Sequence, residues 1–377
     1  MAQNSKEKID ILGIDASNIV VGGGLTQLNY FLNYFIDTKV NKKLVIFLNS
    51  NIRLSHKDKN IKFIKIGKLL SNNYFLRLFW AKFILPKQLK KYNCDKLFCP
   101  GGLSLQKEIP SIVMFRNMQP FQLSRNTLYG LSFSTVRILF LRILLTYSFK
   151  KSKKIIFLSE SSKKIILKRI KNINDYKIIH HGVNFSKFNK FKNLNFKKKI
   201  SIIYVSSFDV YKNHLNIIHA INNLLKLDYK IEITFIGSIA NKKYFKKILK
   251  LKRLLDPYNK FIFLKENISH NNLLKEYHKY DLGIHASSCE NFPNIVLEML
   301  SLGLPVITSS IPAMKEILGN EYIFFDEKNV KDIELKIINF LNTNFFVDIL
   351  ESKKSLFKEK YDLNNQLNKT FKFIFNE

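Results

Sequence analysis

The chain has 377 residues, and at about 100 to 200 residues per domain this length predicts two domains. With 46% hydrophobic and 24% charged residues the chain can bury full cores, which excludes a disordered or fibrous protein. Lys and Arg number 62 against 29 Asp and Glu, and the net charge of +33 favours anionic ligands or surfaces as partners. Only eight basic residues are Arg, whose bidentate fork reads nucleic-acid bases, so no nucleic-acid partner is expected.

The cysteines and the amino terminus indicate the compartment. Cys94, Cys99 and Cys289 are an odd number without metal-ligand spacing, so the sequence predicts neither a disulfide framework nor a zinc site. The first residues carry charges where an export signal needs an apolar run. We therefore expect a cytoplasmic protein.

Short β-rich runs alternate with helical patterns, as in parallel sheets covered by helices. In the first half, strands are predicted at 9–14, 44–48, 61–66, 96–99, 112–115, 154–158 and 177–180. In the second half they are predicted at 200–205, 231–236, 261–264, 282–285, 305–308 and 322–325. The sequence thus predicts an α/β protein with two doubly wound, Rossmann-like domains at 1–188 and 200–350, a Lys- and Asn-rich linker at 189–199, and a helical segment at 351–377.

Three glycines, Gly22, Gly23 and Gly24, follow the first predicted strand. The helix after them has Thr26 as a plausible cap, and its apolar residues recur at helical spacing: Leu28, Phe31, Leu32 and Phe35. Glycines let a backbone approach a ligand closely, but the run lacks the third glycine of the dinucleotide-binding fingerprint. A ligand-binding loop and a plain flexible turn are both open.

Arg116 and Asn117 follow the strand predicted at 112–115. Open α/β sheets bind ligands at the carboxyl ends of their strands, so these two side chains are candidates for a ligand site. The glycine turn at 98–104 has a similar place and is either functional or structural.

The longest apolar stretch, residues 128–147, has the length of a membrane-spanning helix but contains Arg137 and Arg142. Each arginine costs about 2.5 to 3.5 kcal/mol at the middle of a bilayer, so we expect an amphipathic or core helix instead. Residues 147–199 then carry sixteen basic side chains against Glu160 and Asp175. This pattern predicts either a surface that binds anionic membranes or a solvated lysine face.

Lys212 lies between the strand predicted at 200–205 and a helix with apolar residues at 215, 218, 221, 224 and 225. The N–H groups and the positive dipole end at a helix amino terminus, together with a lysine, favour a phosphate. A solvent-facing lysine is the alternative.

Residues 285–310 form the sharpest pattern. A strand ends near His285, a loop carries Glu290, and Pro293 suits the first turn of a helix. Glu298 falls about five residues into that helix, so the loop and the first turn present two carboxylates and several N–H groups to one crevice. Carboxylates accept the hydroxyls of a ribose or a sugar, and N–H groups hold phosphate. Two solvated glutamates are the alternative, and among the histidines only His285 is a candidate for catalysis.

Three runs now carry a resemblance: ENFPNIVLEMLSLGLPVITSS at 290–310, YVSSFDVYKN at 204–213 and HHGVNFSKF at 180–188. They resemble glycosyltransferase family 4, the retaining group with the GT-B fold, of the bacterial cell-surface polysaccharide type. The resemblance implies two Rossmann-like domains facing a central cleft, the first for the acceptor and the second for the donor.

The family's functional residues carry over by position. The resemblance implies that Glu298 binds the donor ribose, Glu290 the donor sugar and Lys212 the diphosphate, with Lys212 and Glu290 catalytic. The backbone of Phe292, Pro293, Asn294 and Ile295 is implied in sugar and phosphate binding. Ser207 stands where the family often has an arginine. The loop Gly22, Gly23 and Gly24 is implied at the diphosphate and acceptor cleft, where Arg116 and Asn117 replace a frequent histidine.

The implied enzyme is a metal-independent hexosyltransferase that takes a UDP- or GDP-sugar and needs no cofactor. Asp-x-Asp, the motif of metal-dependent glycosyltransferases, does not occur in the sequence. The acceptor that the resemblance implies for this enzyme is a glycan or a lipid-linked precursor of O-antigen or capsule, at the cytoplasmic face of the membrane. Two alternatives remain: a nucleotide-sugar 2-epimerase of the same fold, or a non-enzymatic basic protein that binds membranes or nucleic acid.

Overall fold

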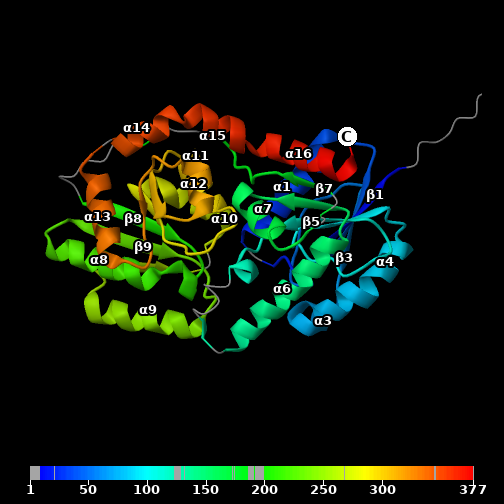
Figure 1. The fold of residues 1–377 in the computed structure, drawn as a ribbon, viewed down its shortest axis with the longest axis horizontal. Coiled ribbons are helices and arrows are strands. Elements are labelled where there is room, and N and C mark those ends of the chain that lie inside the picture. The colour runs from blue at the N-terminus through cyan, green and yellow to red at the C-terminus, as the bar shows by residue number, and fades with distance from the viewer. Residues whose placement is uncertain are drawn as a thin grey trace, which may run out of the picture. The chain divides into compact units, whose positions relative to one another are not determined.

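A computed structural model describes residues 9–20, 22–122, 129–130, 132–171, 173, 175–185, 191, 199–266, 268–343 and 345–376 (Figure 1). The chain divides into two compact units. The first unit comprises Met1–Asn117, Arg137–Ile179 and Leu367–Glu377, and the second comprises Met118–Val136 and His180–Gln366. The predicted linker at 189–199 lies almost entirely outside the described residues, so the proposed boundaries stay a prediction.

The first unit contains a sheet of seven parallel strands in the order β3-β2-β1-β4-β5-β6-β7. Its strands are β1 (Ile11–Ala16), β2 (Lys43–Leu48), β3 (Ile61–Lys65), β4 (Lys96–Cys99), β5 (Ser111–Phe115), β6 (Lys154–Phe157) and β7 (Asp175–Ile178). All five residues of β5 are buried. Such continuous apolar runs are typical of parallel strands that helices cover on both faces.

Helices connect these strands. They are α1 (Gly23–Thr38), α2 (Lys68–Asn72), α3 (Tyr74–Phe79), the π-helix η1 (Trp80–Ile84), α4 (Leu85–Lys91), α6 (Phe133–Lys151), α7 (Glu160–Leu167) and the last helix, α16 (Leu363–Phe375). The helix predicted at 128–147 corresponds to α6, which begins later, and Leu128 lies outside the described residues. No helix in the described part of the chain is long and apolar enough to span a membrane.

The second unit contains six parallel strands in the order β10-β9-β8-β11-β12-β13. They are β8 (Ile200–Val205), β9 (Ile231–Ile236), β10 (Ile262–Lys265), β11 (Leu282–His285), β12 (Val306–Ser309) and β13 (Phe324–Phe325). Its helices are η2 (Gln119–Phe121), η4 (Val210–Lys212), α8 (His214–Lys226), α9 (Lys242–Leu255), α10 (His270–Glu276), η5 (Tyr277–Lys279), α11 (Asn294–Ser301), α12 (Pro312–Leu318), α13 (Val330–Leu341), α14 (Phe345–Ser352) and α15 (Lys354–Tyr361). In Figure 1, α8 and α9 lie on one side of the sheet, and α11 and α12 lie on the other.

The predicted fold class is confirmed: each of the thirteen predicted strands is present, with ends shifted by a few residues. Thr26, in contrast, was wrongly predicted as a helix cap, because α1 begins at Gly23 and its N-cap is Gly22. Gly22 has a φ of 70° and a ψ of −157°, a conformation that side chains disfavour, and this explains a glycine there.

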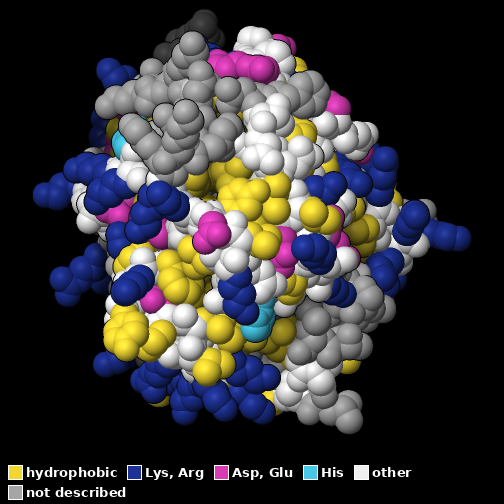
Figure 2. All heavy atoms as spheres, turned by 90° about the vertical axis from the view of Figure 1, so that its left-hand side faces the viewer, with side chains coloured by type: hydrophobic (Ala, Val, Ile, Leu, Met, Phe, Trp, Pro, Cys, Tyr) yellow, Lys and Arg dark blue, Asp and Glu magenta, His cyan; other side chains and the backbone are white. Residues whose placement is uncertain are grey.

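On the face of the molecule that Figure 2 shows, the basic side chains are spread rather than gathered in one place. Figure 2 shows one face of the molecule, on which Lys and Arg side chains are scattered among apolar ones and Asp and Glu are few. On α9 alone, five lysines are exposed: Lys242, Lys243, Lys246, Lys247 and Lys250. Net charge by itself therefore does not identify a binding surface.

The carboxyl-terminal helix is held to the first unit by aromatic packing. Phe371 is 4% exposed, and its ring centroid lies 6.3 Å from that of Phe31 and 6.4 Å from that of Phe35, both on α1. The ring of Phe375 lies beside it, with the centroids 4.5 Å apart and the planes tilted by 39°. The end of the chain thus completes the core over α1.

We expect Phe371→Ala to reduce the free energy of unfolding by about 3 to 5 kcal/mol, because it removes a buried ring and leaves a cavity against α1. Denaturant unfolding of the full chain measures this. Lys372→Ala, one residue away and exposed, should change it by no more than about 0.5 kcal/mol. A loss as small as that of the control would show that α16 is not anchored by this ring.

Candidate active site

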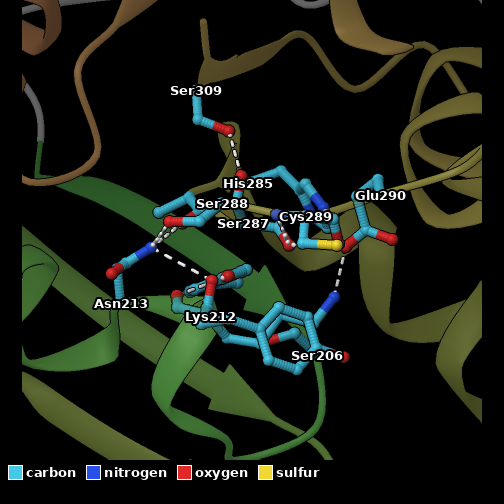
Figure 3. A network of polar contacts seen from close by, with 12 residues as sticks. Ser206, Lys212, Asn213, His285, Ser287, Ser288, Cys289, Glu290 and Ser309 are labelled. Atoms are coloured by element: carbon cyan, nitrogen blue, oxygen red, sulfur yellow. Dashed lines mark hydrogen bonds and ion pairs between the residues drawn. The ribbon is translucent and has the colours of Figure 1, made fainter. Parts of the chain in front are cut away.

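Lys212 and Glu290 form a buried ion pair at the carboxyl ends of two neighbouring strands. Lys212 ends η4, shortly after β8, and Glu290 lies in the loop after β11, the strand beside β8 in the sheet. The Nζ of Lys212 contacts Oε1 of Glu290, as Figure 3 shows. Their side chains are only 10% and 17% exposed. The structure therefore brings together the two residues that the sequence singled out in separate motifs.

Both members of this pair stay charged. Burial alone would raise the pKa of Glu290, but the ammonium of Lys212 and the ring of His285 hold it well below its usual range. Burial would likewise lower the pKa of Lys212, and the carboxylate of Glu290 raises it above its ordinary value. A fixed positive charge thus lies at the strand ends, held by a fixed negative one.

His285, the last residue of β11, completes this cluster. Its ring is 2% exposed, and Nε2 lies 3.2 Å from Oε1 of Glu290. Burial lowers the pKa of His285, although Glu290 opposes the shift, so the ring is neutral near pH 7. A neutral ring that donates from Nε2 to Glu290 carries no proton on Nδ1. This leaves Nδ1 as a buried acceptor with no partner among the described residues.

A second set of hydrogen bonds fixes the loop that carries Lys212. Asn213 follows it in the left-handed conformation, with a φ of 53°. Its Nδ2 donates to the carbonyl of Ala286 at 2.7 Å and to Oγ of Ser288 at 2.8 Å (Figure 3). The hydroxyl of Ser288 in turn donates to Glu327 at 2.6 Å. The loops after β8, β11 and β13 are thereby tied together, a connection that the sequence did not predict.

Ser207 and the residues from Phe292 to Ile295 lie around this cluster. Ser207 follows β8, and its side chain forms a hydrogen bond with Tyr211. Because a serine is uncharged, position 207 supplies no positive charge. Phe292 is 6% exposed, and Pro293 occupies the N-cap of α11 rather than its first turn, where the sequence had predicted it. The first-turn N–H groups of Asn294 and Ile295 have no acceptor within the helix, as at any helix start.

Glu298 lies in α11 and is paired with a residue that the sequence analysis missed. It is 8% exposed, and its Oε1 lies 2.9 Å from Nε2 of His270, the first residue of α10. The hydrogen bond to Glu298 raises the pKa of His270, and partial burial opposes this. The only local signal was Ser269, an N-cap that predicts a helix start but not a contact 28 residues away.

Several buried polar atoms near α11 have no hydrogen-bond partner in the described structure. They are Oε2 of Glu298, Oδ1 of Asn294, the hydroxyl of Tyr277 and Nδ1 of His285. Burial raises the pKa of Tyr277, and the charge of Glu298 adds to this shift, which places the two groups near one another. Because buried polar groups are nearly always bonded and most of these atoms are acceptors, the set could take hydrogen bonds from the hydroxyl groups of a polar ligand. No three metal-binding side chains gather among the described residues.

The candidates of the first unit form a group of their own. Arg116 follows β5, and its Nη1 lies 3.0 Å from the position that a Cβ on Gly24 would occupy. Gly24 therefore makes room for this guanidinium, while Gly22 and Gly23 are exposed beside it. Burial lowers the pKa of Arg116 to about 10. The structure thus joins Arg116 to the glycine loop, and Asn117 follows, exposed.

We expect the stabilising effect of the His270–Glu298 pair to depend on pH. Because the folded pKa of His270 is raised, the added stability is fully present below the ordinary pKa of 6.5 and is lost as the pH rises through the folded value. Thermal unfolding should show a larger Tm deficit of His270→Asn at about pH 6 than at about pH 9. His219→Asn, exposed on α8, should show no such difference between the two pH values, and equal deficits for His270→Asn would contradict the pairing.

Comparison with known proteins relates this cluster to an enzyme family. Residues 185–360, which include Lys212, Glu290 and Glu298, match the family model of the glycosyl transferases group 1. Protein CapJ of Staphylococcus aureus is 28% identical over 195 residues, a match that covers 52% of this chain and 48% of CapJ. The chain thus spans about half the length of this relative.

Solved structures resemble the whole chain. HepE of Anabaena in complex with UDP-glucose has a TM-score of 0.69 at 12% identity, covering 97% of this chain and 99% of that one. The lipopolysaccharide outer core galactosyltransferase WaaB has a TM-score of 0.64 at 16% identity, covering 98% and 99%. The segment that carries the strand-end cluster therefore matches the glycosyl transferases group 1, and the chain has the GT-B fold.

Proposed function

We propose that the protein is a retaining glycosyltransferase of family 4, which transfers a sugar from a nucleotide-sugar to a glycan or lipid-linked acceptor in cell-surface polysaccharide synthesis. The observation that carries this proposal is the strand-end cluster of the second unit, where a buried lysine and unpartnered polar atoms lie within the matched segment. HepE was solved with UDP-glucose, which supports a UDP-sugar as donor, and a GDP-sugar is the alternative. WaaB, a lipopolysaccharide galactosyltransferase, supports a surface glycan as product.

In this proposal each part of the donor meets a group of matching chemistry. The ribose hydroxyls donate to the free Oε2 of Glu298, and the diphosphate lies between the ammonium of Lys212 and the first-turn N–H groups of α11. The hydroxyls of the transferred sugar bond Glu290. Ser207 adds no charge, so Lys212 carries the electrostatic stabilisation in the second unit.

The reaction breaks the bond between the anomeric carbon and the diphosphate oxygen, which takes the electron pair. The acceptor oxygen forms the new bond to this carbon, and its proton passes to an oxygen of the departing diphosphate. Negative charge grows on the leaving diphosphate in the transition state, where a fixed ammonium and aligned N–H groups stabilise it without reorganisation. We propose that these groups make a metal ion unnecessary and that the chemistry needs no cofactor.

We further propose that the first unit binds the acceptor through the glycine loop and Arg116, and that the enzyme works at the cytoplasmic face of the membrane. The guanidinium beside Gly24 lies at the carboxyl edge of the first sheet, where open α/β sheets bind ligands. A lipid-linked acceptor would lie in the membrane surface, which accounts for a peripheral location.

Thermal unfolding with a panel of UDP-, GDP- and ADP-sugars tests the proposed donor. One series should raise Tm, because a ligand that binds only the folded state stabilises it by RT ln(1 + L/Kd), where L is the free ligand concentration. No shift with any sugar nucleotide, together with RNA or DNA binding that moderate salt abolishes, would favour a non-enzymatic basic protein instead.

Glu298→Gln should weaken binding of the preferred nucleoside diphosphate by about one to two orders of magnitude, since a charged acceptor to ribose hydroxyls contributes about 1.5 to 3 kcal/mol. Calorimetry with the 2′-deoxy and 3′-deoxy analogues provides the control. The variant should discriminate against them less than the wild type does. If the variant still discriminates against the deoxy analogues as strongly as the wild type does, Glu298 does not bind the ribose.

Lys212→Ala should raise the activation barrier of turnover by about 2 to 4 kcal/mol, because it removes the charge opposite the leaving diphosphate. It also strands Glu290 as an unpaired buried charge, so Tm should fall. Lys212→Ala combined with Glu290→Gln should recover Tm but not turnover. If the double variant turns over within about threefold of the wild type, the lysine does not stabilise the leaving group.

A further inference from the structure

An exposed aromatic stripe runs along α3 and η1 in the first unit. Phe75, Phe79 and Phe83 recur every four residues, about one helical turn apart, and are 62%, 51% and 55% exposed. The rings of Phe79 and Phe83 lie 5.0 Å apart. Trp80 and Ala81 on the same segment are buried, so the segment has one face in the core and one apolar face outside. Folded monomers rarely leave so many aromatic rings together in water.

A second apolar stripe lies on α6. Leu139, Phe140 and Ile143 are 41%, 40% and 65% exposed, while Ile138 and Leu145 point into the core. Burial raises the pKa of Tyr74 on α3 and lowers that of Arg77, and the charge of Arg137 on α6 acts on both groups. This places the two helices beside one another, as Figure 1 shows. We call these two stripes together the α3–α6 surface.

The charges around this surface are all of one sign. The sequence has no Asp or Glu from residue 59 to 94 or from 109 to 159, the segments that supply both helices. Exposed lysines flank the aromatic stripe at Lys68, Lys82, Lys87 and Lys90. An apolar face bordered by lysines and free of carboxylates complements a bilayer that contains anionic lipid, whose acyl region takes the rings and whose headgroups take the ammonium groups.

We propose that the α3–α6 surface binds an anionic lipid bilayer by inserting Phe75, Phe79 and Phe83 below the headgroups. The purpose of this contact would be to hold the enzyme beside a lipid-linked acceptor. In this respect the inference rests on the proposed function and deepens it. The aromatic rings, which the sequence analysis did not single out, carry the attachment.

One lysine of the basic segment predicted at 147–199 is held by contacts within the protein. Lys154 is a residue of β6, and its side chain is 12% exposed. It donates to the carbonyl of Phe373 at 2.7 Å and lies 3.9 Å from Asp175. It is therefore engaged within the first unit and is not available to lipid headgroups.

Vesicle flotation of the full chain tests the proposal, with phosphatidylcholine vesicles that contain phosphatidylglycerol or lack it. The triple variant Phe75→Ser, Phe79→Ser and Phe83→Ser should lose at least about tenfold of its partitioning into the anionic vesicles, because three rings no longer leave water. Leu254→Ser with Leu335→Ser is the matched control, since these side chains are 75% and 52% exposed on helices of the second unit. The control should float like the wild type.

Two further measurements separate the outcomes. Phe79→Trp should show a blue-shifted emission with anionic vesicles, because its ring enters the bilayer; the native Trp80 is 4% exposed and gives a constant background. Unchanged flotation of the triple variant, or no blue shift, would overturn the proposal. So would concentration-dependent dimerisation that the triple variant alone abolishes, with no binding to vesicles. Tm shifts with sugar nucleotides report separately on the proposed function.

Discussion

The ammonium of Lys212 and the carboxylate of Glu290 are held together away from bulk water, and this places strong demands on the loops around them. A buried charge that loses its partner costs several kcal/mol, so the loops after β8 and β11 must keep the pair in contact. His285 supplies a further hydrogen bond to the carboxylate, and Asn213 ties the lysine loop to the loop after β11. Because the charges are fixed in advance, the diphosphate that we propose to bind beside Lys212 would meet a site that needs little reorganisation.

The pair also limits how a donor can be held. Lys212 has three N–H donors and gives one to Glu290, so the others remain for the phosphate oxygens of the proposed donor. Glu298 follows the same principle with the opposite sign: Oε1 takes the hydrogen bond of His270, and Oε2 stays buried and unbonded. In both cases a protein partner orients the functional group while leaving part of its bonding capacity for a ligand. We infer that the second unit recognises its ligand through groups that use only part of their hydrogen-bonding capacity within the protein.

Sequence patterns predicted the strands well because fully buried parallel strands are short apolar runs, which local composition reveals. Lys212 and Glu290 could be predicted from the sequence for a related reason. Both follow predicted strands, and parallel strands in neighbouring positions end at the same edge of a sheet. The role of His270 could not be predicted from the sequence, because its contact with Glu298 depends on how α10 packs and not on the spacing of the two residues along the chain. Thr26 failed as a cap because the glycines before it already adopt the helix start. The exposed face of α3 was missed because a stripe of aromatic residues at helical spacing equally predicts a core.

The two units differ in the chemistry that they expose, and this difference has a physical basis. A nucleotide-sugar is charged and soluble in water, so a site for it needs buried ion pairs and hydrogen-bonding groups, and the second unit has these. A lipid-linked acceptor is apolar at one end and stays in a membrane, so the unit that meets it needs exposed apolar side chains bordered by positive charge. The first unit has these on α3 and α6, in two segments without a single carboxylate. Lysines elsewhere, as on α9, lack an aromatic stripe beside them, so basic charge alone would not select the face that contacts lipid. The position of the aromatic rings, rather than the net charge, is therefore the feature from which we infer the contact with lipid.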